Sequence, residues 1–204
     1  MRLFLAVDPD EAASGAVARA AERLRRCAEA RHRTLAHAVR WVEPGNLHLT
    51  LHFLGEVDEV RLASVKTVLA APLAAGPLRV ELGDWGVFPT AGPARVIWIG
   101  LSAGAAALAR LHAELAGRLR QAGIALDDRP FSPHLTIGRV KQPGRADWGA
   151  LVRSVAPPAC GFDVVACTLY RSHLAGAGPS YEPLLRISLE APPAGVPGAG
   201  DRLA

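Results

Sequence analysis

Two nearly identical four-residue segments, His48-Leu49-Thr50-Leu51 and His134-Leu135-Thr136-Ile137, occur one in each half of the chain. Residues two apart on a β-strand share a face, so each histidine projects with its threonine while the aliphatic residues enter the core. This repeat predicts two strands in related places of a duplicated fold. If the two halves pack as related lobes, the His-Thr pairs face each other across a cleft.

The residue types of the repeat suit chemistry at phosphorus. Two imidazoles with ordinary pKa values near 6.5 can supply one general base and one general acid at neutral pH. Two threonine hydroxyls can hold the non-bridging oxygens of a phosphoryl group. In-line displacement needs a base on the attacking side and an acid on the leaving-group side. We therefore expect His48, His134, Thr50 and Thr136 to form a phosphoryl-transfer site.

Two other interpretations of the repeat compete with this one. The histidines could be structural, with the threonines present for their β propensity, but that does not account for the duplication. A metal site is the second alternative, yet the chain has no HExxH motif, no zinc-like Cys/His spacing and no clustered carboxylates. We expect no metal and no cofactor. The lack of a GxxxxGK motif also argues against a P-loop nucleotide enzyme.

Size and composition indicate one compact unit of two lobes. The chain has 204 residues, of which 50% are hydrophobic and 21% charged, enough apolar content for a sizeable core. The apolar opening from Met1 to Val7 is too short for a signal-peptide core, and no run approaches a membrane span. We expect a cytoplasmic protein with no membrane partner.

Charge and cysteine usage constrain the partners and the redox setting. There are 23 basic against 19 acidic residues, for a net charge of +4, and only Lys66 and Lys141 are lysines. This arginine bias is compatible with a polyanionic partner without establishing one. Three cysteines without a CxxC pair argue against a disulfide framework or zinc module and favour reduced thiols.

Hydrophobic periodicity predicts an α+β protein with largely antiparallel sheets. The expected strands are Arg2–Val7, Arg40–Val42, Leu47–Leu54, Leu78–Val87, Arg95–Leu101, Ser132–Val140, Phe162–Leu174 and Tyr181–Glu190. The expected helices run from Pro9 to about Arg31, over Val57–Ala71, from Ser102 to Gln121, and over Asp147–Val155. A glycine-rich turn is expected over residues 175–179. We expect residues 1–190 to form a single bilobal domain and residues 191–204 to be a disordered tail.

Capping signals mark the ends of two of these helices. Asp8-Pro9 suggests a helix start with Asp8 as the cap. An apolar stripe along the helix is then marked by Val17, Ala20, Leu24 and Cys27. Ser102 is a candidate cap for the third helix, which Gly123 would stop.

At the repeated segments the chain resembles the two-histidine (2H) phosphoesterase superfamily, and more narrowly the bacterial and archaeal RNA 2′,3′-cyclic phosphodiesterases, also called 2′-5′ RNA ligases. The matching segments are Arg2-Leu3-Phe4, Arg40-Trp41-Val42, Asn46 to Leu51, Phe53-Leu54-Gly55-Glu56, Gly86-Val87-Phe88-Pro89, Arg95-Val96-Ile97-Trp98, Phe131 to Thr136, Gly138-Arg139-Val140, Ser172-His173-Leu174 and Gly178-Pro179-Ser180-Tyr181. The resemblance extends to about Leu189.

This resemblance implies a fold and a reaction. The fold would be bilobal, with two mostly antiparallel β-sheets facing across a V-shaped central cleft and helices outside. The reaction would be metal-independent hydrolysis of an RNA-terminal 2′,3′-cyclic phosphate to a 2′-phosphate, and we expect the chain to act as a monomer. By analogy, His48 is the acid that protonates O3′ and His134 is the base that activates water, although the sequence also permits the exchanged roles.

Other functions for the same residues stay open at this point. One is 2′-5′ joining of RNA ends, or cleavage of other 2′-linked nucleotides, by the same site. Another is a non-catalytic RNA-binding module whose histidines only hold phosphate.

The family also implies roles for Phe53 and Arg139, which each lie five residues after a motif histidine. Phe53 would stack on the terminal base and Arg139 would contact the nucleotide or its phosphate. Strict alternation, however, places both side chains on the face opposite the histidines. A bulge or strong twist near Gly138 would bring Arg139 to the site. The alternatives are a core aromatic for Phe53 and a solvated charge for Arg139.

The remaining histidines are secondary candidates. His52 shares a strand face with His48 by alternation, so we expect it at the rim of the cleft. His32, His37 and His112 fall in or near helical segments and are expected on the surface, while His173 lies near a hairpin end, beside the cleft.

Overall fold

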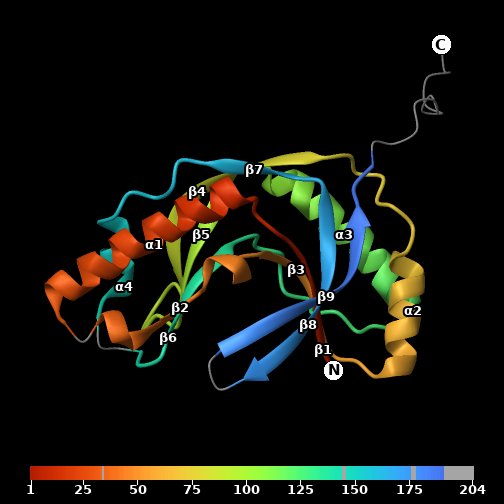
Figure 1. Cartoon of the computed structure of the whole chain (residues 1–204), viewed down its shortest axis with the longest axis horizontal. Helices are drawn as coiled ribbons and strands as arrows, with labels where there is room; N and C mark the ends of the chain where they lie inside the picture. Colours follow the sequence, from red (N-terminus) through yellow and green to blue (C-terminus); the bar gives the residue numbers. More distant parts are fainter. Residues whose placement is uncertain (34, 144–145, 176–177, 191–204) are drawn as a thin grey trace, which may run out of the picture.

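Strands and α-helices are interspersed along the chain (Figure 1). The structure, a computed structural model, describes residues 1–33, 35–143, 146–175 and 178–190. The elements in chain order are β1 (Arg2–Val7), α1 (Glu11–Arg31), the 3₁₀ helix η1 (Ala36–Ala38), β2 (Val39–Trp41), the 3₁₀ helix η2 (Pro44–Asn46), β3 (Leu49–Glu56), α2 (Glu59–Leu69), β4 (Leu78–Phe88), β5 (Val96–Ala103), α3 (Ala105–Gln121), β6 (Leu135–Val140), α4 (Trp148–Arg153), β7 (Gly161–Val164), β8 (Ala166–Ala175) and β9 (Gly178–Ser188).

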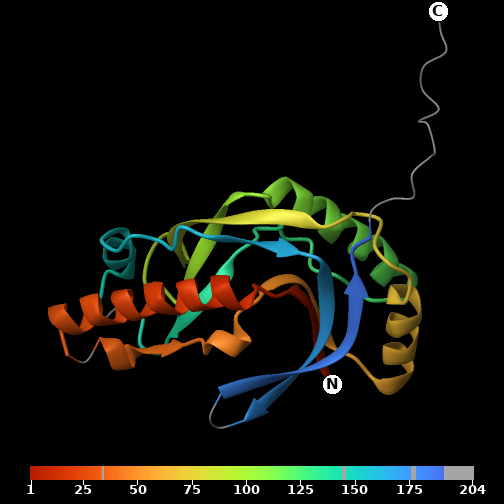
Figure 2. The same cartoon turned by 45° about the horizontal axis from the view of Figure 1, so that its top comes forward.

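The strands form one curled antiparallel sheet rather than two separate sheets (Figures 1 and 2). Its order is β7-β4-β5-β6-β3-β1-β8-β9, and β2 pairs with β6. The predicted α+β class with antiparallel strands is confirmed. The prediction of two sheets is corrected because β3 and β6 pair with Leu49 opposite Leu135, which joins the two halves of the sheet.

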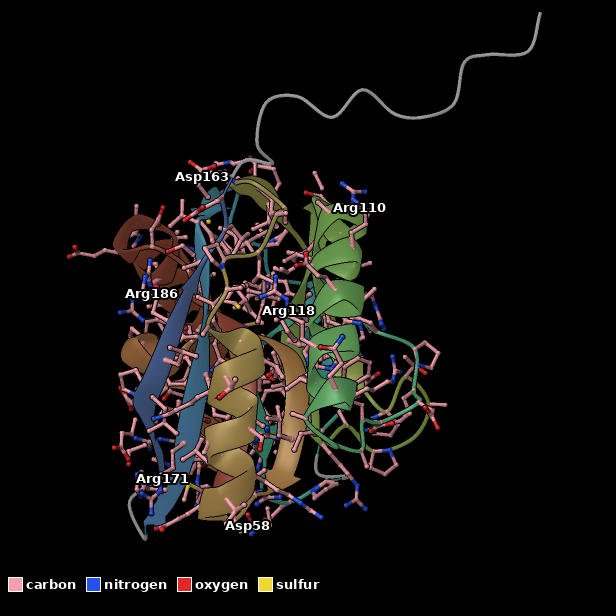
Figure 3. The ribbon with its side chains drawn as sticks, turned by 90° about the vertical axis from the view of Figure 1, so that its right-hand side faces the viewer. Asp58, Arg110, Arg118, Asp163, Arg171 and Arg186 are labelled. Atoms are coloured by element: carbon pink, nitrogen blue, oxygen red, sulfur yellow. The ribbon has the colours of Figure 1, made fainter. Side chains whose placement is uncertain are left out.

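Each half of the sheet has its own pair of helices. Helix α1 packs with α4, which contacts β4, whereas α3 packs with α2 and contacts β3 (Figure 1). Arg118 of α3 fastens the second pair, since its guanidinium donates hydrogen bonds to the carbonyls of Ala71 and Pro72 after α2 (Figure 3). One helix pair thus lies against β4 and the other lies against β3, one of the two strands that carry the repeated segments.

Two predicted helix caps are corrected. The N-cap of α1 is Asp10, whose carboxylate accepts a hydrogen bond from the Ala13 N–H at 2.7 Å, so Asp8 lies before the helix. Ser102 belongs to β5, and its hydroxyl donates to the Leu82 carbonyl at 2.9 Å. Helix α3 begins after Gly104, whose φ of 88° favours glycine.

The predicted strand Phe162–Leu174 is two strands in different halves of the sheet. Strand β7 pairs with β4 at one edge, whereas β8 pairs with β1 and β9 near the other edge. Val165 lies between them and is exposed, so the chain crosses from one half to the other at this residue. A continuous apolar run does not reveal which partner strand each part takes.

The core occupies the space between the sheet and the helices. The aliphatic residues of the repeat, Leu49, Leu51, Leu135 and Ile137, are buried as predicted. The predicted α1 stripe is buried at Val17, Ala20 and Leu24, whereas its fourth member, Cys27, is only half-buried. In the described ranges no helix is long and apolar enough to cross a membrane. The predicted tail, 191–204, and residues 176–177 of the predicted turn lie outside the described residues.

Candidate active site

His48 lies immediately before β3, at the end of the segment that follows η2. Its Nδ1 is 2.8 Å from the carbonyl oxygen of Asn46, two residues earlier. The Asn46 side chain in turn donates to the Pro179 carbonyl of β9 at 3.2 Å. This network ties the segment that carries His48 to the β8–β9 hairpin.

His134 has the same geometry at the start of β6. Its Nδ1 is 2.7 Å from the Ser132 carbonyl, again two residues earlier. A carbonyl only accepts hydrogen bonds, so Nδ1 donates in both histidines and Nε2 is the atom left to take up or release a proton. Both motif histidines are therefore pre-oriented in the same tautomer.

The antiparallel pairing of Leu49 with Leu135 places each motif histidine diagonally across from the other, on the side of the other motif's threonine. The pKa of His48 lies below its ordinary value, chiefly because burial disfavours the imidazolium. The positive charges of Arg139 and His134 also lower it, while the Asn46 carbonyl and the Asp8 carboxylate act in the opposite direction. The second histidine and Arg139 thus lie within electrostatic reach of the first.

Aromatic rings flank both histidines. The His48 ring lies 5.0 Å from Phe4 and 5.1 Å from Tyr181, measured between ring centroids. The His134 ring lies 5.2 Å from Phe88 and 5.9 Å from Trp98. The aromatic contacts limit how far each imidazole can turn about the anchor at its Nδ1.

Thr50 and Thr136 are half-buried, in contrast to the fully buried leucines that precede them. Thr50 pairs in register with Ala6 of β1, and Thr136 with Trp98 of β5. Each threonine therefore lies on the strand face opposite the core, two residues after its histidine, as the repeat predicts.

A register shift follows each motif threonine and corrects the strict alternation expected from the sequence. In β3, Thr50 pairs with Ala6 but His52 pairs with Leu5, which leaves Leu51 as the extra residue of a bulge. The shift moves Phe53 to the solvent-facing side, where it is 62% exposed. Phe53 lies 6.2 Å from the Phe4 ring that contacts His48, so it is not a core aromatic.

A matching register shift in β6 lies next to Gly138, where a bulge was expected to bring Arg139 to the site. Gly138 pairs with Ile97 and Thr136 with Trp98, which leaves Ile137 unpaired. Arg139 is exposed, and its charge acts on both His48 and Tyr181. A Cβ at Gly138 would lie 2.6 Å from Val39 Cγ1, so the close approach of β2 requires glycine at this bulge.

The shift in β3 places His52 away from the predicted rim. His52 is buried, its Nε2 is 2.8 Å from the His112 carbonyl, and its ring stacks on His112 at 3.9 Å. The His112 ring stacks in turn on Phe131 at 4.3 Å. The expectation of a surface position for His112 is corrected, because this stack between β3 and α3 half-buries the ring and lowers the pKa of His112 to about 4.

The remaining histidines lie elsewhere. His173 on β8 contacts Glu182 of β9 at 2.8 Å, and its carboxylate partner accounts for its position in the hairpin. His32 and His37 are exposed, as expected.

A pocket of about 200 Å³ opens beside His48. It is lined by Asp8, Gly45, Asn46, Leu47, His48, Tyr170, Tyr181 and Pro183. Sequence reasoning missed Asp8 and Tyr170 as site residues. The sequence position of Asp8 is that of a helix cap. No sequence pattern points to Tyr170, because its place near the site depends on the pairing of β8 with β1, which are far apart in the sequence.

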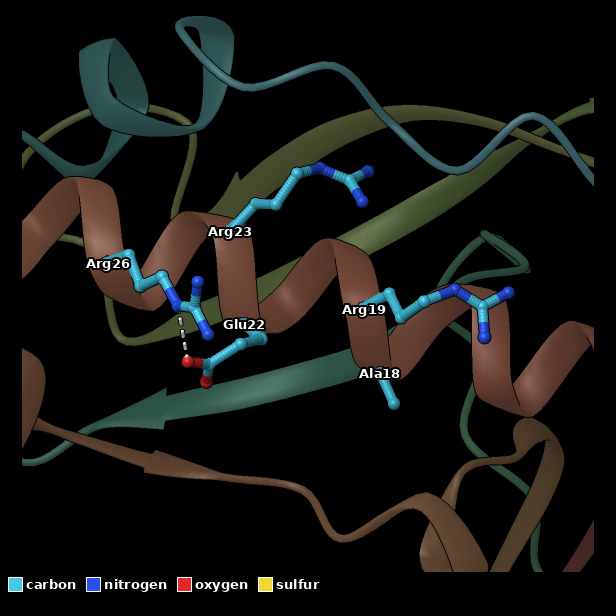
Figure 4. Close-up of a pocket in the computed structure, with 5 residues that line it drawn as sticks. All are labelled: Ala18, Arg19, Glu22, Arg23 and Arg26. Carbon is cyan, nitrogen blue, oxygen red and sulfur yellow. Dashed lines mark hydrogen bonds and ion pairs between the residues drawn. The ribbon is translucent and has the colours of Figure 1, made fainter.

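A second hollow lies on the exposed side of α1 and is rich in arginine (Figure 4). Its lining residues are Ala18, Arg19, Glu22, Arg23 and Arg26. Arg26 pairs with Glu22 at 2.9 Å, and Arg23 donates to the Ala156 carbonyl at 3.3 Å. It contains no imidazole, so we place the candidate chemistry at the two motif histidines.

Metal-ligating residues do not gather at either place. Among the residues that the structure describes, no group of three or more His, Cys, Asp or Glu side chains could hold a metal ion. The absence of a metal requirement in the reaction stays a prediction.

A protein-family model described as the 2′-5′ RNA ligase superfamily matches residues 7–176 of the chain. The RNA 2′,3′-cyclic phosphodiesterase of Archaeoglobus fulgidus is 35% identical over 187 residues, which cover 90% of this chain and 98% of the relative. The RNA 2′,3′-cyclic phosphodiesterase of Thermotoga maritima is 30% identical over 93% of this chain and 96% of its own length.

Solved structures are similar over nearly the same length. The crystal structure of TT0787 of Thermus thermophilus has a TM-score of 0.75 and 31% identity, covering 94% of this chain and 99% of its own. The crystal structure of E. coli LigT complexed with 3′-AMP has a TM-score of 0.67 and 28% identity, covering 92% of this chain and 97% of its own.

Proposed function

Because this chain belongs to the 2′-5′ RNA ligase superfamily, we propose that it hydrolyses the terminal 2′,3′-cyclic phosphate of RNA to a 2′-phosphate. One observation carries the proposal. Two His-x-Thr pairs meet where β3 joins β6, and both histidines have Nδ1 anchored on the carbonyl two residues earlier. Two imidazoles anchored through the same nitrogen, each with Nε2 free for proton transfer, suit a reaction that needs both a base and an acid at one phosphorus atom.

The proposed mechanism is an in-line displacement. Nε2 of His134 takes a proton from water as its oxygen attacks phosphorus. The bond between phosphorus and O3′ breaks, and Nε2 of His48 gives its proton to O3′. The products are a 2′-phosphate monoester and a free 3′-hydroxyl, and both histidines return to their starting states by proton exchange with solvent.

Thr50, Thr136 and Arg139 are proposed to hold the phosphate. The two hydroxyls donate hydrogen bonds to the non-bridging oxygens, where negative charge gathers as the displacement proceeds. The exposed Arg139 guanidinium, within electrostatic reach of His48, adds a positive charge on the same side. These three side chains bind the transition state without taking part in proton transfer.

Phe53 is proposed to stack on the terminal base. Its ring is 62% exposed and lies next to Phe4, which contacts His48, so an occupied site would cover a large apolar surface. Base–aromatic stacking is worth about 1–3 kcal/mol per base and tolerates different bases. RNA ends that carry the cyclic phosphate are thus the proposed partners, bound by a single copy of the chain.

Incubation with a 2′,3′-cyclic mononucleotide in excess EDTA tests the proposal. The expected result is turnover to the 2′-nucleotide, identified by chromatography against 2′- and 3′-nucleotide standards. Release of the 3′-nucleotide would contradict the proposed departure of O3′. Binding of the nucleotide without turnover would instead support a non-catalytic RNA-binding module, and a parallel reaction with a 2′-5′-linked dinucleotide measures cleavage of that linkage.

A further inference from the structure

The Asp8 side chain lies in the candidate active site and does not cap the helix that it precedes. Its Oδ2 accepts a hydrogen bond from the Tyr170 hydroxyl at 2.9 Å and a longer one from Thr168 at 3.4 Å. Both donors belong to β8, which pairs with β1 directly before Asp8. Because Asp10 caps α1, the Asp8 carboxylate serves no helix end.

The Asp8 carboxylate and the His48 imidazole line the same pocket. Both side chains are half-buried, so water screens the attraction between them less than it would at the surface. The carboxylate does not orient the ring, because Nδ1 of His48 already donates to the Asn46 carbonyl. Its effect on the ring is therefore electrostatic, and it favours the imidazolium form.

We propose that Asp8, held by Tyr170, acts through His48: its negative charge favours the protonated form of His48 and so supports His48, rather than His134, as the proton donor. The kinetic part of this inference rests on the proposed function. The electrostatic part does not, because it concerns the protonation of His48 in the free protein.

The charges around His48 explain why such a residue is needed. Burial lowers the pKa of His48, and the positive charges of Arg139 and His134 lower it further. These effects favour the neutral imidazole, so a proton donor at this position needs an opposing charge that limits the fall of its pKa. Asp8 supplies that charge, alongside the Asn46 carbonyl.

The groups that face Asp8 decide its own protonation. Burial raises the pKa of the Asp8 carboxyl, which favours the neutral acid. The hydroxyls of Tyr170 and Thr168 and the positive charges of His48 and Arg186 oppose this and favour the carboxylate. Arg186 lies on β9, where it pairs in register with Thr168 (Figure 3). Burial and the Asp8 charge raise the pKa of Tyr170 to about 12, so its hydroxyl stays a proton donor to the carboxylate.

The test is an NMR titration of the histidine rings in the full chain, with the His48 signal assigned by its loss in His48→Ala. Asp8→Asn keeps an oxygen that accepts from Tyr170 and removes only the charge. It should move the midpoint of the His48 titration down by about one pH unit, the low end of the effect of a nearby opposite charge. Tyr170→Phe should move the midpoint in the same direction by a smaller amount, because the carboxylate loses its main hydrogen-bond donor.

Asp163→Asn is the matched control. Asp163 is an exposed carboxylate on the edge strand β7, where it lies 3.6 Å from Arg79 (Figure 3). Its removal should leave the His48 titration unchanged. If Asp8→Asn folds like the wild type but the pKa of His48 does not fall, the inference is overturned. If Asp8→Asn does not fold, an unchanged pKa in Tyr170→Phe overturns it.

Kinetics then separate this inference from the proposed function. In Asp8→Asn the basic limb of the pH–rate profile should move to lower pH, and kcat/KM on that limb should fall about tenfold if the limb moves by one pH unit. A moved acidic limb would assign the donor role to His134 and overturn the inference while hydrolysis itself stands. If the wild-type protein shows no turnover, the proposed function is wrong. The NMR titration alone would then test whether the Asp8 charge raises the pKa of His48.

Discussion

Leu49 of β3 lies opposite Leu135 of β6, and each of these buried leucines directly follows a motif histidine. In the described part of the chain this is the register at which the two halves of the sheet meet. The distance between the proposed acid and base therefore depends on the packing of two core side chains.

Leu135→Ala should lower the free energy of unfolding by about 2–5 kcal/mol, because it leaves a cavity where the halves join. Urea unfolding followed by far-UV circular dichroism measures this loss. Val60→Ala is the control, since Val60 is 80% exposed and its truncation should change stability by no more than about 0.5 kcal/mol. Equal effects of the two substitutions would show that the join is not tightly packed.

His48→Ala and His134→Ala should each lower kcat by about 10² to 10⁴, the usual range for a general acid or base. The double variant should lose far less than the product of the two effects, because the residues act as one unit. Near-normal turnover in either single variant would rule out the two-histidine mechanism.

The pH dependence of kcat/KM should be bell-shaped, because one imidazole must be neutral while the other is protonated. Each single histidine variant should lose one limb of this bell. We expect His48→Ala to lose the basic limb, which belongs to the acid, and His134→Ala to lose the acidic limb. The reverse pattern would exchange the two roles.

Arg139→Ala should raise KM by about tenfold or more with little change in stability, because it removes a charge-assisted contact to phosphate from an exposed position. Arg110→Ala, on the outer side of α3 (Figure 3), is the matched control and should leave KM unchanged. If both variants keep the wild-type KM, Arg139 is a solvated surface charge.

Stability should fall as the pH drops from 6.5 towards 4. Burial and the charges of His52 and Arg120 lower the pKa of His112 to about 4 in the folded protein. The unfolded chain, with a histidine pKa near 6.5, takes up this proton first, so the stability present above pH 6.5 is lost progressively below it.

Replacement of the His112 ring tests this pH dependence. His112→Phe keeps a flat ring in the stack and should reduce the loss, as measured by urea midpoints from about pH 7 to about pH 4.5. His37→Phe, at an exposed position, controls for the removal of a histidine. An equal pH dependence in wild type and His112→Phe would contradict the prediction.

The positions of Phe53 and His52 show where sequence patterns stop being informative. Alternation along β3 predicts His52 beside His48 and Phe53 in the core, and both predictions are wrong. A bulge adds one residue and exchanges the two faces of a strand, and no side-chain pattern within β3 reveals it. Its place is decided by the pairing with β1, a strand from another part of the sequence.

Local chemistry and spacing were sufficient to predict the two His-Thr pairs, the buried aliphatic residues between them and the antiparallel α+β class, because strand alternation is a short-range property. Tertiary structure alone decided that the sheet is continuous, that bulges turn Phe53 and Arg139 to the exposed side, and that Asp8 lines the His48 pocket instead of capping α1. Each of these depends on which distant strand lies alongside, and that choice follows from the packing of the whole core rather than from any one segment.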